Sequence, residues 1–273
     1  MIQDLGDKKL FNEYKELEAE EQDSVFCFDG DKLIVSKAAD GTLAIPKAAD
    51  FVNQKMQYLF RIDEERYFLI LDKAEKPSEY QWESTRNFRR LEDKKLAFAA
   101  ATAYHLYQWY RDNRFCGRCG QRLEHDHIER MLRCKACGNM IFPKIAPAVI
   151  VAVTDGNKIL LTKYNGRVYK NYALIAGFTE VGETAEETVA REVMEEVGLK
   201  VKNIKYYKSQ PWGTDCNLLL GFFCDLDGDG AITMDRHELS TAEWFEREEM
   251  PTDDDGYSLT REMMSIFREG VMK

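Results

Sequence analysis

The sequence lacks a long hydrophobic segment. Its longest apolar run, Ile145 to Val153, is too short to cross a bilayer and contains Pro147. The first residues, MIQDLGDKKLFNEYKELEAEEQD, are acidic and hold no apolar core of about 7 to 15 residues, which argues against a secretory signal or a transit peptide. We therefore expect a cytoplasmic protein with no membrane association.

Basic residues are also in deficit. The chain has 38 Lys and Arg against 48 Asp and Glu, a net charge of -10. A phosphate backbone would be repelled by most of such a surface, so a general coating of nucleic acid is disfavoured. Segment 111–135 is locally basic, with seven Lys or Arg against four Asp or Glu. Nucleic acid would have to bind this patch, although patches of this size are also common on solvated surfaces.

Proline and glycine are not in excess either. The chain has 6 Pro and 17 Gly among 273 residues, and 44% of its residues are apolar. This composition excludes a collagen-like or largely disordered protein. At about 100 to 200 residues per domain, the length favours two or three domains.

The first part of the chain has the pattern of a small β domain followed by a helix. Short β-like runs such as VFCFDGDKLIVS and RYFLILD fill residues 25–71 between charged turns, which predicts antiparallel strands. Residues 91–112 carry Ala, Leu and aromatic residues at helical spacing. His105 lies in this stripe, and a lone histidine there is usually a core residue, so we assign it no ligand role.

The cysteines have the spacing of a metal site. In a reducing compartment, seven cysteines favour metal ligands or free thiols over disulfides. Two CxxC pairs, separated by 14 residues, match a four-cysteine zinc ribbon better than an iron-sulfur site or unrelated thiols: Cys116, Cys119, Cys134 and Cys137. Four sulfurs leave no open position, so this zinc would be structural. His125 and His127, between the pairs, are expected on the surface, and Cys27, Cys216 and Cys224 are expected as packing residues.

The most informative segment is YALIAGFTEVGETAEETVAREVMEEVGLK, after a predicted buried hairpin at IAPAVIVAVTDGNKILLT. Thr184 and Glu187 form a capping box, and Gly198 is a C-terminal stop, so a helix is predicted from about 185 to 197. At about 100° per residue, Glu192 and Glu196 lie about 40° apart, with Glu195 about 60° to the other side. Like charges on one face repel, whereas divalent cations would neutralise them. The alternative is an exposed acidic helix.

This string resembles the Nudix box, GX5EX7REUXEEXGU with U aliphatic, and every fixed position matches from Gly177 to Leu199. The resemblance implies hydrolysis of a nucleoside diphosphate linked to another moiety, with Mg²⁺ or Mn²⁺ bound by the helix glutamates. The order of β domain, ribbon and Nudix domain, followed by SQPW at Ser209–Trp212, resembles the NADH pyrophosphatase (NAD diphosphatase) family. The family's tag is SQPWPFPxS, and this chain reads SQPWGTDCN.

The resemblance implies roles for individual residues. Glu195 corresponds to a water activator or a further ligand, and Arg191 to a structural orienter that pairs with Glu183. The implied ligands of the catalytic metal are the backbone carbonyl of Ala176 and the carboxylates of Glu192, Glu196 and Glu238.

The resemblance also implies a set of substrate contacts. Phe178 and Trp212 resemble aromatic walls that stack a base or nicotinamide ring; the alternative for Trp212 is a core or dimer-interface residue. Phe142 stands where the family has tyrosine, and Thr260 where it has alanine. The full set is Glu129, Phe142, Phe178, Gln210, Pro211, Trp212, Gly213, Thr214, Asp215, Cys216, Asn217 and Thr260.

One motif imitates a calcium site. Asp225, Asp227, Asp229 and Gly230 begin like an EF-hand loop, but the twelfth residue is Arg236 instead of the required glutamate, and a strand precedes the loop. We therefore exclude calcium and predict a hairpin turn here.

These patterns together predict an α+β protein of three parts: a β-rich N-terminal domain ending in a helix (1–112), a four-cysteine zinc ribbon (113–142), and a Nudix hydrolase domain with a mixed sheet between helices (143–273). The expected reaction is metal-dependent hydrolysis of NAD(H) to nicotinamide mononucleotide and AMP. Another dinucleotide or ADP-linked substrate such as ADP-ribose, NAD-capped RNA, and a metal-sensing module without turnover are the alternatives. The family resemblance also implies a homodimer.

Overall fold

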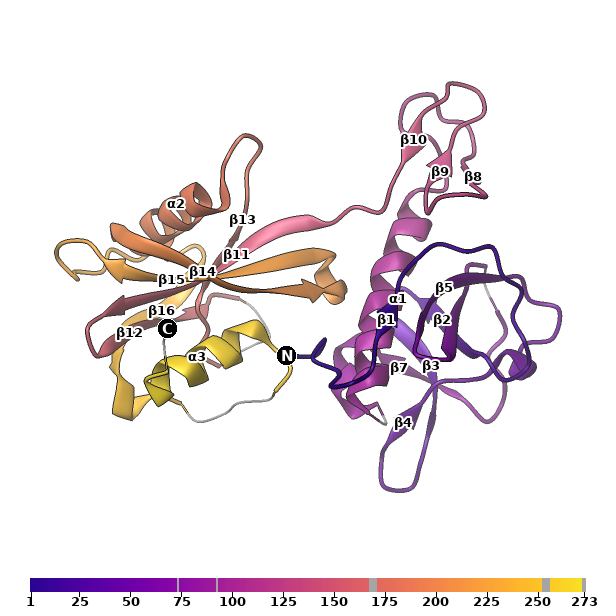
Figure 1. Cartoon of the computed structure of the whole chain (residues 1–273), viewed down its shortest axis with the longest axis horizontal. Coiled ribbons are helices and arrows are strands. Elements are labelled where there is room, and N and C mark those ends of the chain that lie inside the picture. The colour runs from indigo at the N-terminus through magenta and orange to yellow at the C-terminus, as the bar shows by residue number, and fades with distance from the viewer. Residues whose placement is uncertain (73, 92, 167–170, 252–255, 272–273) are drawn as a thin grey trace. The chain divides into compact units, whose positions relative to one another are not determined.

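The computed structural model describes residues 1–72, 74–91, 93–166, 171–251 and 256–271 (Figure 1). The chain forms two compact units. The C-terminal unit contains Met1, Ile145–Pro211 and Asn217–Lys273, and the N-terminal unit contains Ile2–Lys144 and Trp212–Cys216. In the described ranges, no helix is long and apolar enough to cross a membrane.

The N-terminal unit is built on a sheet, as the alternating apolar runs predict. The described strands of this sheet follow the order β1-β5-β6-β2-β3-β4, with β7 beside β3. Both faces of the sheet are buried and aromatic, with Phe26 and Phe60 against Tyr67 on one face and Tyr58 against Phe68 on the other. The strands are β1 (Leu10–Phe11), β2 (Ser24–Asp29), β3 (Lys32–Lys37), β4 (Leu43–Ala44), β5 (Met56–Ile62), β6 (Glu65–Ile70) and β7 (Gln81–Ser84), with a 3₁₀ turn η1 (Ala48–Asp50).

The predicted antiparallel arrangement is wrong for one pair. Strand β2 pairs with β6 in parallel, with Val25 opposite Phe68, whereas the other pairs of this sheet are antiparallel. Three strands intervene between β2 and β6 in the sequence, so the chain has room to return in the same direction. Alternation of apolar residues reports which face is buried and carries no information on strand direction.

The predicted helix is α1 (Lys94–Asp112), preceded by a 3₁₀ segment η2 (Thr85–Arg90). It begins three residues later than predicted because the Asp93 carboxylate accepts the N–H of Leu96 at 2.6 Å and caps the helix. Its small residues pack closely on the sheet, and Ala97, Ala99 and Ala100 are fully buried.

The segment after α1 carries three short strands, β8 (Glu124–His125), β9 (Leu132–Arg133) and β10 (Met140–Ile141), in the order β10-β9-β8. The expectation that both intervening histidines lie on the surface is wrong for His125. Its ring is half-buried and stacks on Tyr110 with centroids 5.0 Å apart. His127 is exposed, as expected, and its Nδ1 lies 3.1 Å from the Glu16 carboxylate.

The C-terminal unit is a mixed sheet between two helices. Its strand order is β14-β15-β11-β12-β16, with β13 beside β11, and β11 and β15 are parallel. The predicted hairpin at the start of the unit is present as β11 and β12. The strands are β11 (Ala146–Asp155), β12 (Lys158–Tyr164), β13 (Ile175–Phe178), β14 (Val201–Trp212), β15 (Asn217–Leu226) and β16 (Leu239–Glu246). The helices are α2 (Ala185–Val197) and α3 (Leu259–Glu269), with a 3₁₀ turn η4 (Arg247–Glu249). The 3₁₀ turn η3 (Gly213–Asp215), between β14 and β15, belongs to the N-terminal unit.

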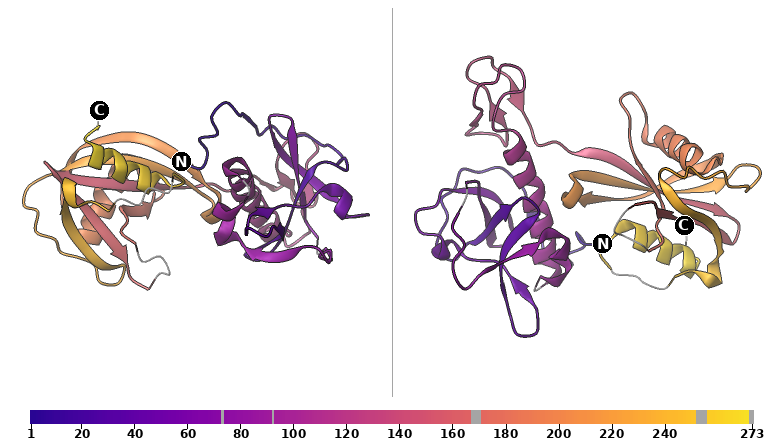
Figure 2. Two further views of the ribbon diagram at one scale, coloured as in Figure 1. Left: turned by 90° about the horizontal axis from the view of Figure 1, so that it is seen from below. Right: turned by 180° about the vertical axis from the view of Figure 1, so that it is seen from behind.

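Helices α2 and α3 cover opposite faces of this sheet (Figure 2). Alternate residues of β11 point to opposite sides, so Val149 and Val151 pack in one core with Val193 of α2, while Ile150 packs in the other with Phe267 of α3. This sandwich fixes α2 against the sheet along its whole length. The predicted α+β class with a mixed sheet is confirmed.

The prediction of a hairpin turn after NLLLGFFC, at Asp225–Gly230, is wrong. Strand β15 ends at Leu226, and residues 227–238 then cross the sheet, because β16 pairs with β12 on the far side of β11. The Asp-Gly pairs that suggested a tight turn lie instead in this crossover.

Residues Trp212–Cys216, at the altered tag, pack on α1 within the N-terminal unit. A Cβ added to Gly213 would lie 2.1 Å from the carbonyl oxygen of Ala101. The side-chain amide of Gln108 donates to the carbonyls of Gly213 at 3.5 Å and Thr214 at 3.4 Å. At position 213, where the family has proline, the backbone of α1 therefore leaves no room for a side chain in this chain.

We expect Gly213→Ala to lower the stability of the N-terminal unit by about 1–3 kcal/mol, the usual cost of forcing atoms into a filled site. Gly117→Ala is the control, since a Cβ there meets nothing within 4 Å. Urea unfolding followed by tryptophan fluorescence measures both. An unchanged midpoint for Gly213→Ala would contradict the close approach to α1.

Candidate functional site

The acidic helix α2 is defined by local signals at both ends. The Thr184 hydroxyl accepts the N–H of Glu187 at 3.2 Å, and the Glu187 carboxylate accepts the N–H of Thr184 at 2.8 Å. Gly198 ends the helix in the left-handed conformation, with φ of 71°. The predicted capping box, stop and helix bounds are therefore confirmed.

Two of the three predicted helix carboxylates are buried against the sheet. Glu192 is 9% exposed and Glu196 only 1%, whereas Glu195 is exposed. The Glu192 carboxyl group lies against β13, and a Cβ added to Gly177 would be 1.9 Å from its Cδ. Gly177 is thus required for Glu192 to reach the backbone of β13. The alternative of a fully solvent-exposed acidic helix does not describe this face.

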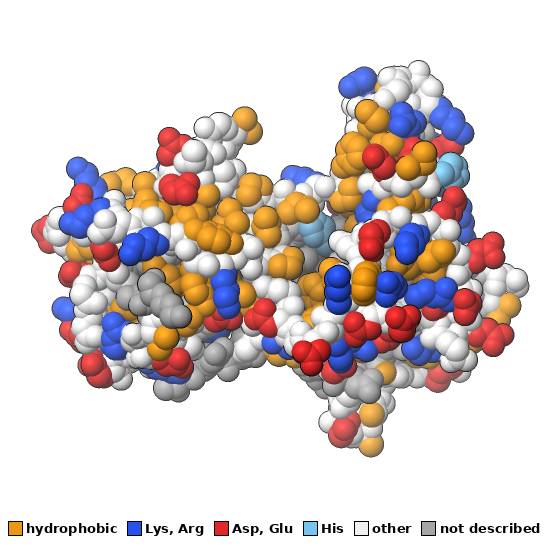
Figure 3. Space-filling model, in the orientation of Figure 1, with side chains coloured by type: hydrophobic (Ala, Val, Ile, Leu, Met, Phe, Trp, Pro, Cys, Tyr) orange, Lys and Arg blue, Asp and Glu red, His pale blue; other side chains and the backbone are white. Residues whose placement is uncertain are grey.

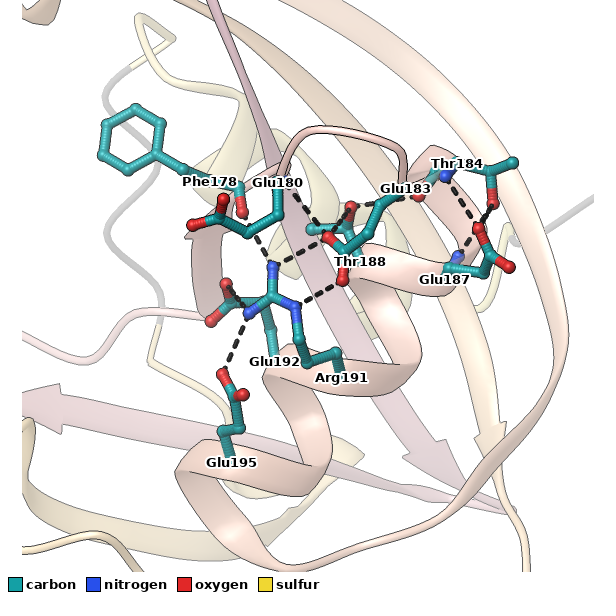
Figure 4. A network of polar contacts seen from close by, with 9 residues as sticks. All are labelled: Phe178, Glu180, Glu183, Thr184, Glu187, Thr188, Arg191, Glu192 and Glu195. Atoms are coloured by element: carbon teal, nitrogen blue, oxygen red, sulfur yellow. Dashed lines mark hydrogen bonds and ion pairs between the residues drawn. The ribbon is translucent and has the colours of Figure 1, made fainter.

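Arg191 connects these carboxylates to the preceding loop (Figure 4). Its Nε and Nη2 donate to Glu183 at 2.6 and 3.0 Å, which is the pairing that the sequence predicted. Its Nη1 donates to Glu192 at 2.7 Å and Glu195 at 2.9 Å, and Nη2 also reaches the carbonyl of Phe178 at 2.9 Å. One guanidinium therefore holds three carboxylates and the end of β13 together.

The electrostatics differ sharply along this network. Burial raises the pKa of Glu192, the neighbouring charges of Glu195 and Glu238 raise it further, and Arg191 opposes them. In contrast, the Arg191 guanidinium, helped by the N–H of Glu180, lowers the pKa of Glu183 to about 2. Glu183 is thus ionised at neutral pH, while the ionised form of Glu192 would gain from a further positive charge.

The remaining predicted metal ligands come from other elements. Ala176 lies in β13 beside Gly177, and Glu238 lies at the end of the crossover, just before β16. The charge of Glu238 acts to raise the pKa of Glu192, although burial is the main cause of its shift. Carboxylate and carbonyl oxygens are the donors that Mg²⁺ and Mn²⁺ prefer, so the chemistry of this set suits such an ion. Glu238 is exposed, however, and the carboxylates of Glu192, Glu196 and Glu238 do not gather within 4.8 Å of one another.

The four predicted zinc ligands converge on one point in the N-terminal unit. Among the described residues, only these thiols bring three or more candidate ligand atoms within 4.8 Å of one another. Two pairs of sulfurs are separated by 3.6 Å (Cys116 and Cys137) and 3.4 Å (Cys119 and Cys134). Partial desolvation acts to raise the pKa of Cys116, but the N–H groups of Arg118 and Cys119 outweigh it and lower the pKa to about 6. A stabilised thiolate is what a structural Zn²⁺ requires.

The predicted substrate residues fall in both units. Phe178 follows Gly177 in the C-terminal unit and is 55% exposed, so its ring is available to a ligand. Phe142 is 52% exposed and Glu129 is exposed, both in the N-terminal unit. Thr260 lies half-buried in the first turn of α3.

The altered tag has two kinds of residue. Gln210 is fully buried, and its amide donates to the carbonyl of Tyr257 at 2.8 Å and accepts the N–H of Leu259 at 2.7 Å. Its side chain therefore holds the start of α3, and contact with substrate would require it to leave these partners. In contrast, the half-buried Trp212 donates from Nε1 to the exposed Asp215 at 2.7 Å, in the turn that packs on α1.

Three further tag residues have distinct surroundings. Pro211 is exposed, Asn217 is buried at the start of β15, and Cys216 is half-buried with a left-handed backbone. All seven cysteines are unbridged, and Cys27 and Cys224 are buried as expected of packing residues.

The basic patch at 111–135 is smaller than its composition suggested. Arg130 turns inward and donates to the carbonyls of Asn12, at 3.2 Å, and Leu59. Four other cations of the patch pair with carboxylates: Arg111, Arg114, Arg133 and Lys135. In the described part of the chain, Arg118 and Arg122 remain outside ion pairs. On the face drawn in Figure 3, acidic and basic side chains are interspersed.

Sequence reasoning missed the residues that position this site. Gly177 could be recognised from the box but not its contact with Glu192, and Gln108 gave no signal because its partners, Gly213 and Thr214, are distant in the sequence. Arg130 could not be distinguished from the surface arginines around it, since burial depends on the folded unit.

Comparison with known proteins assigns two segments of the chain to domain families. Residues 144–265 match the NUDIX domain family, and residues 111–142 match the family described as the NADH pyrophosphatase zinc ribbon domain. The fold and the carboxylate helix thus define a Nudix hydrolase with a four-cysteine zinc ribbon.

Individual relatives narrow this class. A protein named NAD-capped RNA hydrolase NudC from Actinobacillus succinogenes is 38% identical over 205 residues, covering 72% of this chain and 77% of that protein. The protein of this name from Pseudomonas entomophila is 35% identical over 201 residues, covering 74% of this chain and 72% of that protein. A third, from Erwinia tasmaniensis, is 41% identical over 159 residues, which span 58% of this chain and 60% of the relative. The chain belongs to the NADH pyrophosphatase (NudC) family.

We expect Cys134→Ser to lose the zinc, because three thiolates cannot complete the tetrahedral site. Metal content measured by mass spectrometry after gel filtration checks this, and faster proteolysis within 113–142 should accompany the loss, since such ribbons depend on the metal to fold. Cys216→Ser, outside the cluster, is the control and should keep its zinc. Equal zinc in Cys134→Ser and the wild type would refute the assignment.

We expect Glu183→Gln to lower the thermal midpoint at pH 7, because Arg191 loses its main partner. The ordinary pKa of 4.5 falls to about 2 in the folded chain, so the carboxylate stabilises the fold above pH 4.5, and this contribution disappears as pH falls towards 2. The gap between variant and wild type should therefore narrow below pH 4.5. Glu180→Gln, an exposed acid in the same loop, is the control. A gap that widens on acidification would contradict the sign of the shift.

Proposed function

We propose that this chain hydrolyses the pyrophosphate bond of NAD(H) to give nicotinamide mononucleotide and AMP. The observation that carries the proposal is the pair of carboxylates, Glu192 and Glu196, buried on one face of α2 beside the backbone of β13. Buried acids of like charge are costly unless a cation neutralises them, and a metal-bound diphosphate would use such a site. Membership of the NADH pyrophosphatase family supports the choice of dinucleotide.

The catalytic cation in this proposal is Mg²⁺ or Mn²⁺. The carbonyl of Ala176 and the carboxylates of Glu192, Glu196 and Glu238 would hold it. When bound, such an ion polarises phosphoryl oxygens and lowers the pKa of a water molecule. The raised pKa of Glu192 supports this set, because a desolvated carboxylate beside other acids gains from a hard cation.

The other proposed roles belong to the chain's own side chains. Glu195 is exposed and near enough to Arg191 to be oriented by it, which suits a group that accepts a proton from water. Arg191 would orient the helix carboxylates through its contacts with Glu183. Phe178 and Trp212 would stack the aromatic rings of the dinucleotide.

The altered tag supports a second candidate substrate. Gly213–Asp215 form a 3₁₀ turn, and Asp215 accepts a hydrogen bond from Trp212. Thr214 in place of the family's phenylalanine and the carboxylate of Asp215 in place of the proline that follows it alter how the tag would meet a base, so ADP-ribose is the alternative. The remaining tag positions, with Glu129, Phe142 and Thr260, stay in the proposed contact set.

Other features of the proposal concern partners and location. NAD-capped RNA is a further substrate, supported by the names of the relatives, and Arg118 and Arg122 are the cations available to its phosphates. The family also supports a homodimer.

Seven unbridged cysteines suit the reducing cytoplasm, which is the proposed location. The division at residues 112 and 142 into β-rich domain, ribbon and Nudix domain is part of the same proposal.

We expect Glu196→Gln to reduce kcat by at least about 100-fold, because it removes a buried charge from the metal set; second-shell changes alone cost about 10–100-fold. Glu186→Gln, an exposed acid in the first turn of the same helix, is the control and should keep full activity. Release of nicotinamide mononucleotide and AMP from NADH in the presence of Mg²⁺ or Mn²⁺ is the measurement.

The same assay is run on NAD⁺, ADP-ribose and RNA carrying a 5′ NAD cap. The proposal predicts that NADH ranks first or near first. If NADH is the poorest substrate and ADP-ribose the best, the second candidate replaces the first. Unchanged turnover by Glu196→Gln would remove Glu196 from the proposed metal set. No turnover by the wild type on any of these substrates would leave a metal-sensing module without turnover.

A further inference from the structure

The crossover between β15 and β16, residues 227–238, closes the C-terminal end of α2. The last carbonyls of a helix have no partners within it and need donors from elsewhere. The N–H of Thr233 donates to the carbonyl of Val197 at 2.9 Å, and the N–H of Asp235 donates to that of Glu196 at 2.8 Å. The crossover is therefore fixed to the backbone of a residue whose side chain belongs to the proposed metal set.

Asp235 is the centre of a closed turn that continues to Glu238. Its carboxylate accepts the N–H of His237 at 2.8 Å, and its carbonyl accepts the N–H of Leu239 at 2.9 Å. A side-chain hydrogen bond from an aspartate to the N–H two residues later is an Asx turn, and it restricts the backbone to one conformation. Residues 235–239 are thus folded around Glu238.

The end of β12 holds the same turn from the other side. The N–H of Asn165 donates to the carbonyl of Glu238 at 2.8 Å, and its side-chain amide donates to the carbonyl of Arg236 at 3.1 Å. Glu238 is therefore tied by its own backbone to β12 and, through Asp235, to Glu196.

We propose that Asp235 is a positioning residue that sets the place of Glu238 relative to Glu196. Two carboxylates from segments 42 positions apart (238 minus 196) must share one cation, and free acids of like charge would move apart. The Asp235 turn opposes that separation, because it joins both residues through a short path of hydrogen bonds. This inference rests on the proposed function.

The test is Mn²⁺ binding to the full chain, measured by electron paramagnetic resonance titration, together with kcat for NADH. Asp235→Ala removes the Asx turn and keeps the backbone N–H to Glu196. We expect Mn²⁺ affinity to fall roughly 3- to 10-fold, the range for one lost hydrogen bond, with kcat falling in parallel. Asp235→Asn keeps an acceptor oxygen and should restore both to within about twofold.

Asp229→Ala is the matched control. Asp229 makes the same kind of turn in the same crossover, accepting the N–H of Ala231 at 3.2 Å, without contact to α2 among the described hydrogen bonds. It should bind Mn²⁺ like the wild type. Asn165→Ala, which removes the bond to Arg236 and leaves the Asp235 turn intact, tests the same point if Asp235→Ala fails to fold, and should also weaken Mn²⁺ binding.

A double-mutant cycle with Glu238→Gln separates positioning from general loosening. If Asp235 acts through Glu238, adding Asp235→Ala to Glu238→Gln should cost nothing further. Wild-type affinity in Asp235→Ala, additive losses in the cycle, or equal losses in Asp229→Ala would overturn the proposal. Losses in Asp235→Asn as large as in Asp235→Ala would also overturn it, since the charge of Asp235 would then be what matters. Failure of the wild type to bind Mn²⁺ would instead overturn the proposed function.

Discussion

The burial of two carboxylates on the inner side of one helix is the constraint on which the C-terminal unit depends. Glu192 and Glu196 stand on the face of α2 that turns towards the sheet, a position that normally holds apolar side chains. The cost of removing like charges from water must be offset by a positive partner. Arg191, the residue just before Glu192 in the helix, supplies such a partner for Glu192. The same short segment of helix thus carries both the buried acid and the charge that balances it.

Much of the surrounding structure serves this arrangement. The capping box at Thr184 and the packing of Val193 in the core fix where the helix begins and which way it faces. Gly177 leaves room for the Glu192 carboxyl group beside β13. Because the helix is closed at its other end by the crossover, a shift of α2 would disturb the sheet, the crossover and the glutamates together.

How much the sequence could predict depended on the distance between interacting residues. The helix Ala185–Val197 and the cysteine pairs were predicted correctly because caps and CxxC spacing are local signals. The parallel pairing of β2 with β6 and the path from β15 to β16 were not, because strand direction and order depend on contacts between distant segments. The same reason hid the stacking of His125 on Tyr110, and the close packing of Gly213 on α1.

The ribbon and the acidic helix present opposite coordination chemistry within one chain. Thiolate sulfurs are soft ligands that select zinc or copper, whereas carboxylate oxygens favour magnesium or manganese. The two sets therefore do not compete for one ion. Oxidants and soft toxic metals would attack the cysteines and leave the glutamates unaltered. Such agents would therefore harm this enzyme by destabilising its zinc ribbon.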